Sequence, residues 1–165
     1  MPSDMLVKLY SLSAKPELDG ELQKQGIQIK RAMPADKSHV VLFVKNNFNG
    51  VWAQECSYTF SAHPVTCMIA VAERHVVGFA CYDAAAKNFF GPVGVHEKWR
   101  GRGVGEALLR ACLRCMKEDG YGYAVIGWVD GAEDFYRRTV QATVIEDSFP
   151  GVYRDLIDIE DERQG

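Results

Sequence analysis

The hydrophobic and polar positions of the chain follow two periods, one typical of strands and one typical of helices. Short apolar or alternating runs predict strands at residues 5–10, 27–31, 66–72, 76–83, 89–95, 121–127, 142–145 and 152–157. Helical spacing and helix-end signals predict helices at residues 15–25, 34–48, 52–60, 102–119 and 130–138. From residue 27 onward the order is strand, two helices, three strands, helix, strand, helix and two strands. Helices and strands thus follow one another along the whole chain, which places it in the α/β class.

Local signals add detail to several of these elements. The polar break at residues 73–75 is short enough to join its flanking strands as a β-hairpin. The run 121–127 is continuously apolar, which predicts a strand covered on both faces. Asp130 and Glu133 match a capping box, with Asp130 as the N-cap of the helix that follows. A turn at residues 150–151 would join the two closing strands.

Length and composition are those of an ordinary globular domain. The chain has 165 residues, of which 47% are hydrophobic, so it can bury a core without disulfide or metal support. We predict three parts: an N-terminal extension at residues 1–25, made of a strand and a short helix, the main domain at 26–158, and an acidic tail at 159–165. The 19 basic and 22 acidic residues give a net charge of -3, which argues against nucleic acid as a partner.

The sequence also predicts a compartment. The longest apolar run, residues 76–82, is far shorter than the roughly 20 residues that span a bilayer, so no membrane association is expected. The first residues do not resemble a signal peptide, which predicts a cytoplasmic protein. The five cysteines are an odd number and lie mostly in apolar stretches, which predicts buried thiols without disulfides. The zinc-like spacing of Cys112 and Cys115 falls on an apolar helix stripe and favours packing, so no metal site is predicted.

The segment of residues 93–109 carries the clearest chemical signal. A strand containing Gly91 and Gly94 runs into a turn with Gly101, Gly103 and Gly105, and the turn opens the most apolar helix of the chain. Glycines leave the backbone N–H groups of such a turn accessible, and the helix N-terminus adds a positive partial charge. The turn is therefore suited to hold a pyrophosphate, with Arg100 and Arg102 adding positive charge beside it.

Other interpretations of this turn are weaker. The glycines alone are also compatible with an ordinary strand-to-helix turn. A dinucleotide fingerprint would need a third, later glycine and a parallel βαβ unit, and a P-loop would need a Gly-Lys-Ser/Thr ending. An RG-rich nucleic-acid arm would repeat, whereas this segment opens an apolar helix.

At these residues the sequence resembles the GNAT superfamily of N-acetyltransferases, whose acetyl-CoA signature is Gln/Arg-x-x-Gly-x-Gly/Ala. Here the signature reads Arg100-Gly101-Arg102-Gly103-Val104-Gly105. The resemblance extends over residues 27–157, because the predicted order of elements is that of the family. It implies a GNAT-type fold of the α+β kind, a mixed, mostly antiparallel central sheet flanked by helices and splayed at the acetyl-CoA site. It also implies acetyl-CoA as the co-substrate, without a metal.

Carried over residue by residue, the resemblance implies roles for particular groups. The backbone of Val93 and Val95 would pair with the pantetheine arm, and the Val95 amide would donate to the thioester oxygen. The pyrophosphate would be held by the amides of Arg100, Gly101, Arg102, Gly103, Val104 and Gly105. Residues 135–138 resemble the family's Phe/Leu-Tyr-x-Lys/Arg segment, in which Tyr136 would protonate the departing CoA thiolate. A tyrosine that only packs, or that only positions the sulfur, remains an alternative.

The sequence departs from the family pattern in two places. Residues 127–130 lack the Asn that often orients CoA, and residues 88–95 lack the acid that some members use as general base. Glu55, Asp83 or a water chain would then take the proton of the amine. The acceptor would be bound by variable loops at about residues 47–64 and 147–152. Aromatic residues in the expected cleft, namely Trp52, Tyr58 and Trp128, indicate a small acceptor with an apolar part.

Two functions follow from this reading. The first is an acetyl-CoA-dependent N-acetyltransferase that moves an acetyl group to an amine of a small molecule or peptide by direct attack. The alternative is a non-catalytic module of the same fold that binds acyl-CoA as a sensor or regulator. Exposed strand edges near the C-terminus are compatible with a homodimer. His96 follows the pantetheine strand and is close enough in sequence to reach the cleft.

Overall fold

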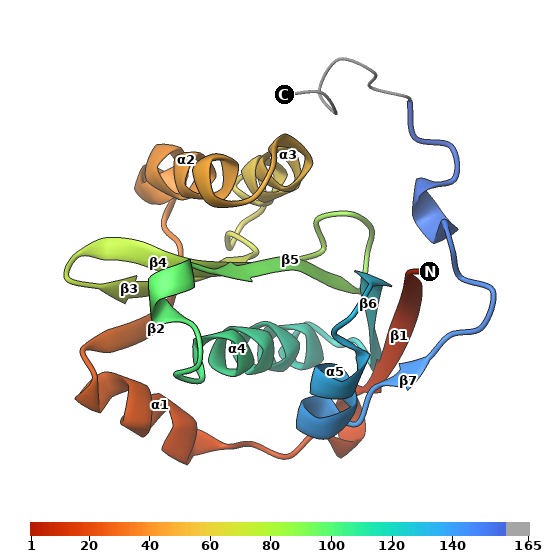
Figure 1. Ribbon diagram of the computed structural model, residues 1–165, viewed down its shortest axis with the longest axis horizontal. Coiled ribbons are helices and arrows are strands. Elements are labelled where there is room, and N and C mark those ends of the chain that lie inside the picture. Colours follow the sequence, from red (N-terminus) through yellow and green to blue (C-terminus); the bar gives the residue numbers. More distant parts are fainter. Residues whose placement is uncertain (158–165) are drawn as a thin grey trace.

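A seven-stranded sheet organises the computed structural model of the protein, which describes residues 1–157 (Figure 1). Its strands are β1 (Ser3–Lys8), β2 (Ile27–Arg31), β3 (Cys67–Ala72), β4 (His75–Tyr82), β5 (Phe89–Val95), β6 (Tyr123–Val129) and β7 (Thr143–Val144). They lie in the order β2-β3-β4-β5-β6-β1-β7. Every neighbouring pair is antiparallel except β5 and β6, which run parallel. The mixed, mostly antiparallel sheet that the sequence predicts is confirmed.

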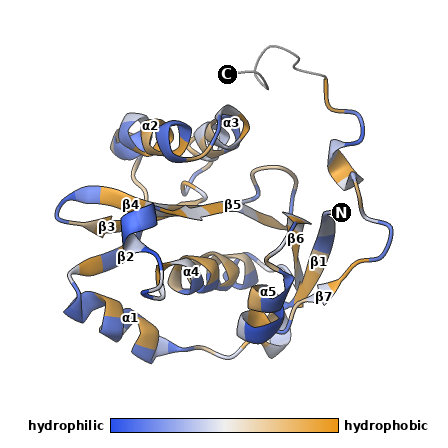
Figure 2. Cartoon of the chain, in the orientation of Figure 1, coloured by the Kyte–Doolittle hydropathy of each residue, from blue (hydrophilic) through white to orange (hydrophobic). Residues whose placement is uncertain are grey.

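Helices cover both faces of this sheet (Figure 1). The α-helices are α1 (Pro16–Lys24), α2 (Lys37–Asn47), α3 (Gly50–Thr59), α4 (Val104–Glu118) and α5 (Glu133–Val140). Short 3-10 helices are η1 (Leu9–Ser11), η2 (Pro34–Asp36), η3 (Glu97–Trp99) and η4 (Gly151–Tyr153). The helices α2 and α3 lie on one face, and α4 lies on the other with α1 and α5 beside it. The helices α1, α2 and α5 alternate between hydrophobic and hydrophilic residues, as expected for helices with one face on the core (Figure 2).

Each face of the sheet has its own apolar cluster. The first lies between the sheet and α4, whose long apolar stripe includes the fully buried Leu108, Leu113 and Met116. The second lies under α2 and α3, where Val40 and Val44 are fully buried. Together these layers make the sheet rigid, which holds the ends of β5, β6 and α4 in fixed positions.

The predicted hairpin between β3 and β4 is confirmed, with a loop of two residues. Glu73 and Arg74 both have positive φ, 53° and 65°. Positive φ at both central residues is typical of a type I′ turn, whose twist matches that of the flanking strands. The loop is one residue shorter than the predicted break because His75 already belongs to β4.

The N-terminal strand is an internal part of the sheet. β1 pairs with β6 on one side and with β7 on the other, and the side chains of Met5 and Val7 are fully buried. The prediction of a closing strand at residues 152–157 is wrong. This segment begins in η4, and Val152 and Ile157 are 50% and 84% exposed. The segment instead leaves the sheet, and the Tyr153 hydroxyl bonds to Glu55 of α3.

Two further predictions are corrected near the end of β6. The strand is covered on one face only, since Ala124 and Ile126 are buried against α4, whereas the alternate residues Tyr123, Val125 and Gly127 are exposed or partly exposed. The helices of the opposite layer pack over β4 and β5 instead. The capping box is also absent: α5 has Ala132 at its N-cap, with no side-chain hydrogen bond there. Gly131, with a φ of 82°, turns the chain first, so the helix begins too late for Asp130 to cap it.

Among residues 1–157, no helix combines the length and apolar character that crossing a bilayer requires. The predicted acidic tail, residues 159–165, lies outside the described residues.

Candidate active site

A cleft opens where β5 and β6 separate. The two strands pair only at Phe89 with Val125 and at Phe90 with Ile126. Beyond these pairs Gly91, with a φ of 122°, and an irregularity in the β4–β5 register turn β5 away. The resulting cleft has a volume of about 710 Å³. It is lined by Asn49, Val51, Trp52, Glu55, Ala85, Phe89, Phe90, Gly91, Pro92, Val93, Ile126, Gly127, Trp128, Val129, Asp130, Ala132, Tyr136, Tyr153 and Leu156.

The free edge of β5 presents backbone groups to this gap. The amide of His96 donates to the Val77 carbonyl at 2.8 Å, which sets the alternation of hydrogen-bonded pairs between β4 and β5. Val95 lies opposite Gly78 and Val93 lies opposite Ala80, so both are at positions that do not bond to β4. Their N–H and C=O groups therefore point toward the gap. The Val95 carbonyl accepts a hydrogen bond from Arg100 Nε at 3.0 Å.

The glycine-rich turn leads from this edge into α4. Gly101 and Gly103 have φ values of 76° and 90°, a region that residues with a Cβ rarely adopt. Gly103 is the N-cap of α4, and the amide of Ala107 donates to its carbonyl at 3.0 Å. The amides of residues 104–106 precede this first helical bond, so they have no acceptor within the helix. The turn and the positive end of α4 have the free backbone amides that the predicted anion site requires.

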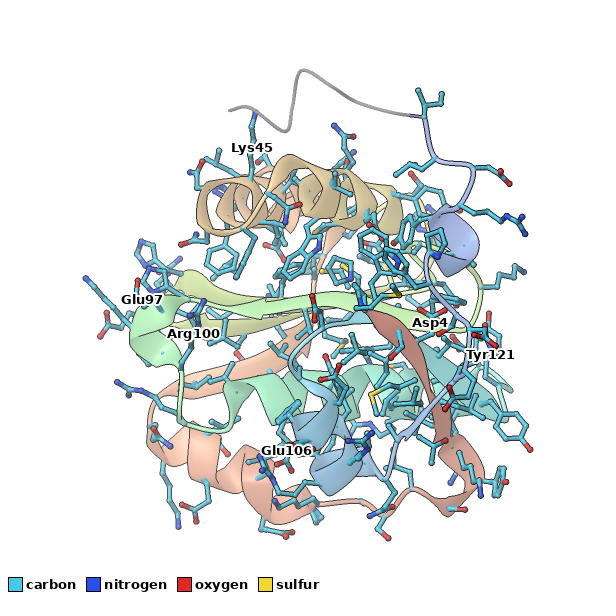
Figure 3. All side chains as sticks on the ribbon, turned by 45° about the vertical axis from the view of Figure 1, so that its right-hand side comes forward. Asp4, Lys45, Glu97, Arg100, Glu106 and Tyr121 are labelled. Atoms are coloured by element: carbon cyan, nitrogen blue, oxygen red, sulfur yellow. The ribbon has the colours of Figure 1, made fainter. Side chains whose placement is uncertain are left out.

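The two arginines of the motif are held by the protein itself. The Arg100 guanidinium bonds to the Val95 carbonyl, and the Arg102 guanidinium lies 4.7 Å from the centre of the Trp99 ring. Both side chains are exposed. Figure 3 shows Arg100 beside the loop that leads to α4. The two guanidinium groups contribute positive potential near the turn. Because each already has a partner within the protein, the backbone amides are the principal hydrogen-bond donors of the turn.

One carboxylate in the first turn of α4 is neutralised by neighbours. Glu106 accepts hydrogen bonds from Lys15 at 3.1 Å and from Arg110 at 2.9 Å (Figure 3 marks Glu106). Burial by itself would raise the pKa of Glu106, but the hydrogen bonds from Arg110 and Lys15 outweigh it and lower that pKa. The ion pair with Lys15 also ties the segment before α1 to the end of α4 that would hold the anion.

Tyr136 reaches the cleft from α5. Tyr136 is 7% exposed. The Phe135 ring lies edge-on to its ring, with the two ring centres 5.2 Å apart. Burial raises the pKa of Tyr136 to about 12. The phenol is therefore protonated at neutral pH and can donate a hydrogen bond or a proton into the cleft.

Glu55 reaches the same cleft from α3 on the opposite side. The Tyr153 hydroxyl donates to its two carboxylate oxygens, at 3.1 and 3.0 Å. Burial raises the pKa of Glu55, and the hydrogen bond from Tyr153 reduces this rise. Asp83, the other acid predicted as a base, accepts from the Asn88 amide at 2.8 Å and the Tyr121 hydroxyl at 3.1 Å. It does not line the cleft, so Glu55 is the better placed of the two.

The wall of the cleft beside β6 is formed by Trp128 and the C-terminal segment. The Trp128 amide donates to Asp4 Oδ1 at 3.0 Å, and its indole N–H donates to the Pro150 carbonyl at 3.2 Å. The indole stacks on Phe149 with ring centres 5.5 Å apart and lies 5.1 Å from the Tyr153 ring. Asp4 lies where β1 meets this segment (Figure 3). The wall is therefore held by the N-terminal strand.

Three aromatic residues were predicted in the cleft, and the structure brings two of them there. Trp52 and Trp128 line it, whereas the Tyr58 side chain is 62% exposed and lies outside the lining. Tyr153, which the sequence did not indicate, is the third aromatic residue of this wall. It was missed because residues 152–157 were predicted as a strand, and Asp4 was missed because it lies in the N-terminal extension. The one available signal for Asp4 was a single acid within an apolar strand.

The cysteines are all buried and free, as the sequence predicts. Cys112 donates to the Ala80 carbonyl at 3.6 Å, consistent with packing in the core. The sulfur atoms of Cys56, Cys67 and Cys81 lie within 4.8 Å of one another, a grouping that their sequence spacing does not indicate. Burial raises the pKa of Cys81, which favours its neutral thiol. His96 caps η3 by accepting from the Lys98 amide at 3.1 Å and does not line the cleft.

Comparison with known proteins identifies the class of this fold. A GCN5-related glucosamine N-acetyltransferase region of a fungal multi-domain β-N-acetylglucosaminidase superposes with a TM-score of 0.71 at 17% identity, covering 87% of this chain and 20% of that one. A GCN5-related N-acetyltransferase from Sphaerobacter thermophilus gives 0.62 at 23% identity, covering 87% and 48%. A GNAT acetyltransferase from Brucella melitensis, solved with acetyl-CoA, gives 0.56 at 20% identity, covering 72% and 86%. The fold is that of the GNAT acetyltransferases.

The sequence agrees with this class. Residues 63–139 match the family model described as the acetyltransferase (GNAT) domain. Residues 63–139 thus resemble a GNAT acetyltransferase domain, and they include the motif at residues 100–105. The chain spans only a fifth of the fungal protein and about half of the Sphaerobacter protein. No curated protein sequence matches it significantly.

Proposed function

We propose that this protein is an acetyl-CoA-dependent N-acetyltransferase that moves an acetyl group to an amine by direct attack. The observation that carries the proposal is the convergence of three features on one cleft. The free backbone edge of β5 faces the gap, the glycine-rich end of α4 lies beyond it, and Tyr136 and Glu55 enter from opposite sides. The acetyl-CoA bound to the Brucella relative supports the same ligand here.

Acetyl-CoA would lie along β5 with its pyrophosphate on the turn at residues 100–105. The backbone groups of Val93 and Val95 would pair with the pantetheine amides as an added strand does. The Val95 N–H would then donate to the thioester oxygen and stabilise the charge that develops there. Catalysis would rest mainly on this positioning and on the oxyanion donor.

The chemical step needs two proton transfers. The neutral amine nitrogen attacks the thioester carbonyl carbon, and the tetrahedral intermediate collapses as the carbon–sulfur bond breaks. The Tyr136 hydroxyl would protonate the departing thiolate, whose ordinary pKa is about 8.5 for a thiol. The nitrogen would pass its surplus proton to the Tyr136 phenolate, and Glu55, directly or through a water molecule, would already have accepted the first proton of the bound ammonium before the attack.

The first experiment is thermal unfolding with and without acetyl-CoA. At a hundredfold excess over Kd a specific ligand adds about 2.7 kcal/mol, so Tm should rise by roughly 5 to 10 °C for a domain of this size. NADH and ATP serve as anionic controls and should give no comparable shift. If acetyl-CoA gives no shift well above micromolar concentration, the proposal is wrong and the turn is only structural.

A matched variant tests the place of binding. Gly105 lies in the first turn of α4, and the nearest atom to a Cβ built on it is Val95 Cγ2 at 3.8 Å. Gly105→Asp therefore fits, and its carboxylate is favourable for the helix end but repels a pyrophosphate. Without ligand, we expect the Tm of Gly105→Asp to be no lower than that of Gly105→Ala. With acetyl-CoA, the Tm of Gly105→Ala should still rise, whereas that of Gly105→Asp should not.

The role of Glu55 predicts a particular pH profile. If a bound ammonium gives its proton to Glu55, kcat/KM should be level between the pKa of Glu55, which burial raises, and that of the acceptor amine. Glu55→Gln should instead need the free amine, so its kcat/KM should rise about tenfold per pH unit toward the amine pKa of about 10. At neutral pH the loss should be about 100-fold or more. A level profile in Glu55→Gln would assign the base elsewhere.

A further inference from the structure

The charge of the cleft restricts the acceptor that it can take. Two carboxylates, Glu55 and Asp130, belong to its lining. Within residues 1–157 the lining includes no lysine, arginine or histidine, so it offers no side-chain cation for an acceptor's carboxylate or phosphate. A cleft with one sign of charge attracts ligands of the opposite sign and repels those of the same sign.

Glu55 is the carboxylate best placed to bind an ammonium group. It is partly buried, and among the described residues its side-chain hydrogen bonds come from the single hydroxyl of Tyr153. One donor shared by two oxygens leaves most of the acceptor capacity of a carboxylate unused. Burial raises the pKa of Glu55, which means that the ionised form lacks a full set of compensating partners. An ammonium group would supply them.

Aromatic surface lies beside this carboxylate. The Trp128 ring is held in place by Asp4 and Pro150, yet its side chain is 47% exposed. A large apolar side chain that is anchored but left accessible is suited to contact a ligand. Tyr153 joins the two groups, because its hydroxyl bonds to Glu55 while its ring lies 5.1 Å from that of Trp128. An amine whose ammonium group binds Glu55 would therefore place its apolar part against the Trp128 and Tyr153 rings.

We propose that the acceptor is a small amine that carries one aromatic or apolar body and no carboxylate, bound with its ammonium at Glu55 and its body at Trp128 and Tyr153. This inference rests on the proposed acetyl transfer and names its substrate class. Free amino acids fit poorly, since their carboxylate would lie near Glu55 or Asp130 without a counter-ion. An arylalkylamine presents the same ammonium and ring without that charge.

The test compares acceptors that differ by one carboxylate. Acetylation of tryptamine, tryptophan and tryptophan methyl ester is measured at saturating acetyl-CoA. We expect kcat/KM for tryptamine to exceed that for tryptophan by about 100-fold, and the ester, which keeps the bulk but not the charge, to recover most of the difference. Equal use of tryptophan, an ester as poor as tryptophan, or preference for a lysine in a peptide would overturn the inference.

Two variants and one control variant locate the residues that discriminate between these acceptors. Glu55→Gln should lower the ratio of kcat/KM for tryptamine to kcat/KM for tryptophan, because it removes the charge that repels the carboxylate of tryptophan. Glu118→Gln removes an exposed carboxylate at the far end of α4 and should keep the wild-type ratio. Trp128→Leu should raise KM for tryptamine more than for propylamine, which has no ring. An unchanged ratio in Glu55→Gln would place the selectivity elsewhere.

Binding separates this inference from the proposed activity. Calorimetric titration of tryptamine and tryptophan into the protein saturated with CoA measures acceptor preference without turnover. Tighter binding of tryptamine supports the inference even if no acetylation occurs, and equal or tighter binding of tryptophan overturns it. Failure of the proposed function would instead appear as the absence of an acetyl-CoA shift in Tm, or as a shift without acetylation of any amine.

Discussion

Removal of residues 2–8 is expected to abolish cooperative folding. This deletion takes out β1, which pairs with β6 on one side and β7 on the other, and with it the fully buried Met5 and Val7. Burying one such side chain contributes about 1.5 to 3 kcal/mol, and the loss of both pairings exposes two strand edges. The sum is comparable to the whole stability of a domain, about 5 to 15 kcal/mol. Circular dichroism during heating should show no sharp transition.

Milder variants keep this prediction testable if the truncated chain cannot be purified. Met5→Ala should lower the free energy of unfolding by about 2 to 5 kcal/mol, since it empties a fully buried site. Lys8→Ala, at the exposed end of the same strand, should stay within about 0.5 kcal/mol. A truncated protein that unfolds cooperatively near the wild-type Tm would show that residues 1–8 are dispensable.

Tyr136→Phe is expected to lower kcat by about 100-fold or more while acetyl-CoA still binds. The substitution removes only the hydroxyl that would protonate the thiolate, and the buried ring keeps its contacts. Because burial raises the pKa of Tyr136 to about 12, the hydroxyl is protonated over the whole working range of pH. Stopped-flow or steady-state release of CoA measures kcat, and the acetyl-CoA shift in Tm measures binding.

The matched control for Tyr136 is Tyr123→Phe, which removes a hydroxyl from a half-exposed ring outside the cleft. It should keep wild-type kcat. If Tyr136→Phe also keeps it, the tyrosine only packs and water protonates the thiolate. If the wild-type protein binds acetyl-CoA but acetylates no amine at all, the acyl-CoA sensor is the better description.

Local patterns predicted much of the fold because they act over a few residues. The hairpin at Glu73 and Arg74, the strand Phe89–Val95 and the apolar helix after Gly103 all follow from periodicity and turn chemistry. The proposed anion site at the start of α4 is predictable for the same reason: its donors would be consecutive backbone amides, and glycines mark them in the sequence. Predictions that depended on distant partners did worse. The predictions of a strand at residues 152–157 and of two-sided burial of β6 were both wrong, because contacts with distant helices decide them.

By itself the sequence determined the class of fold, the glycine-rich turn and Tyr136 as a residue of interest, since each depends on neighbours along the chain. Only the tertiary structure decided that Ser3–Lys8 enters the sheet and that Glu55, rather than Asp83, lines the cleft. It also decided that Tyr153 and Asp4 build the cleft wall with Trp128. Asp4 and Trp128, which are joined by a hydrogen bond, lie 124 positions apart. No local pattern records which of these residues meet, because strand pairing across such separations is selected by the packing of the whole sheet.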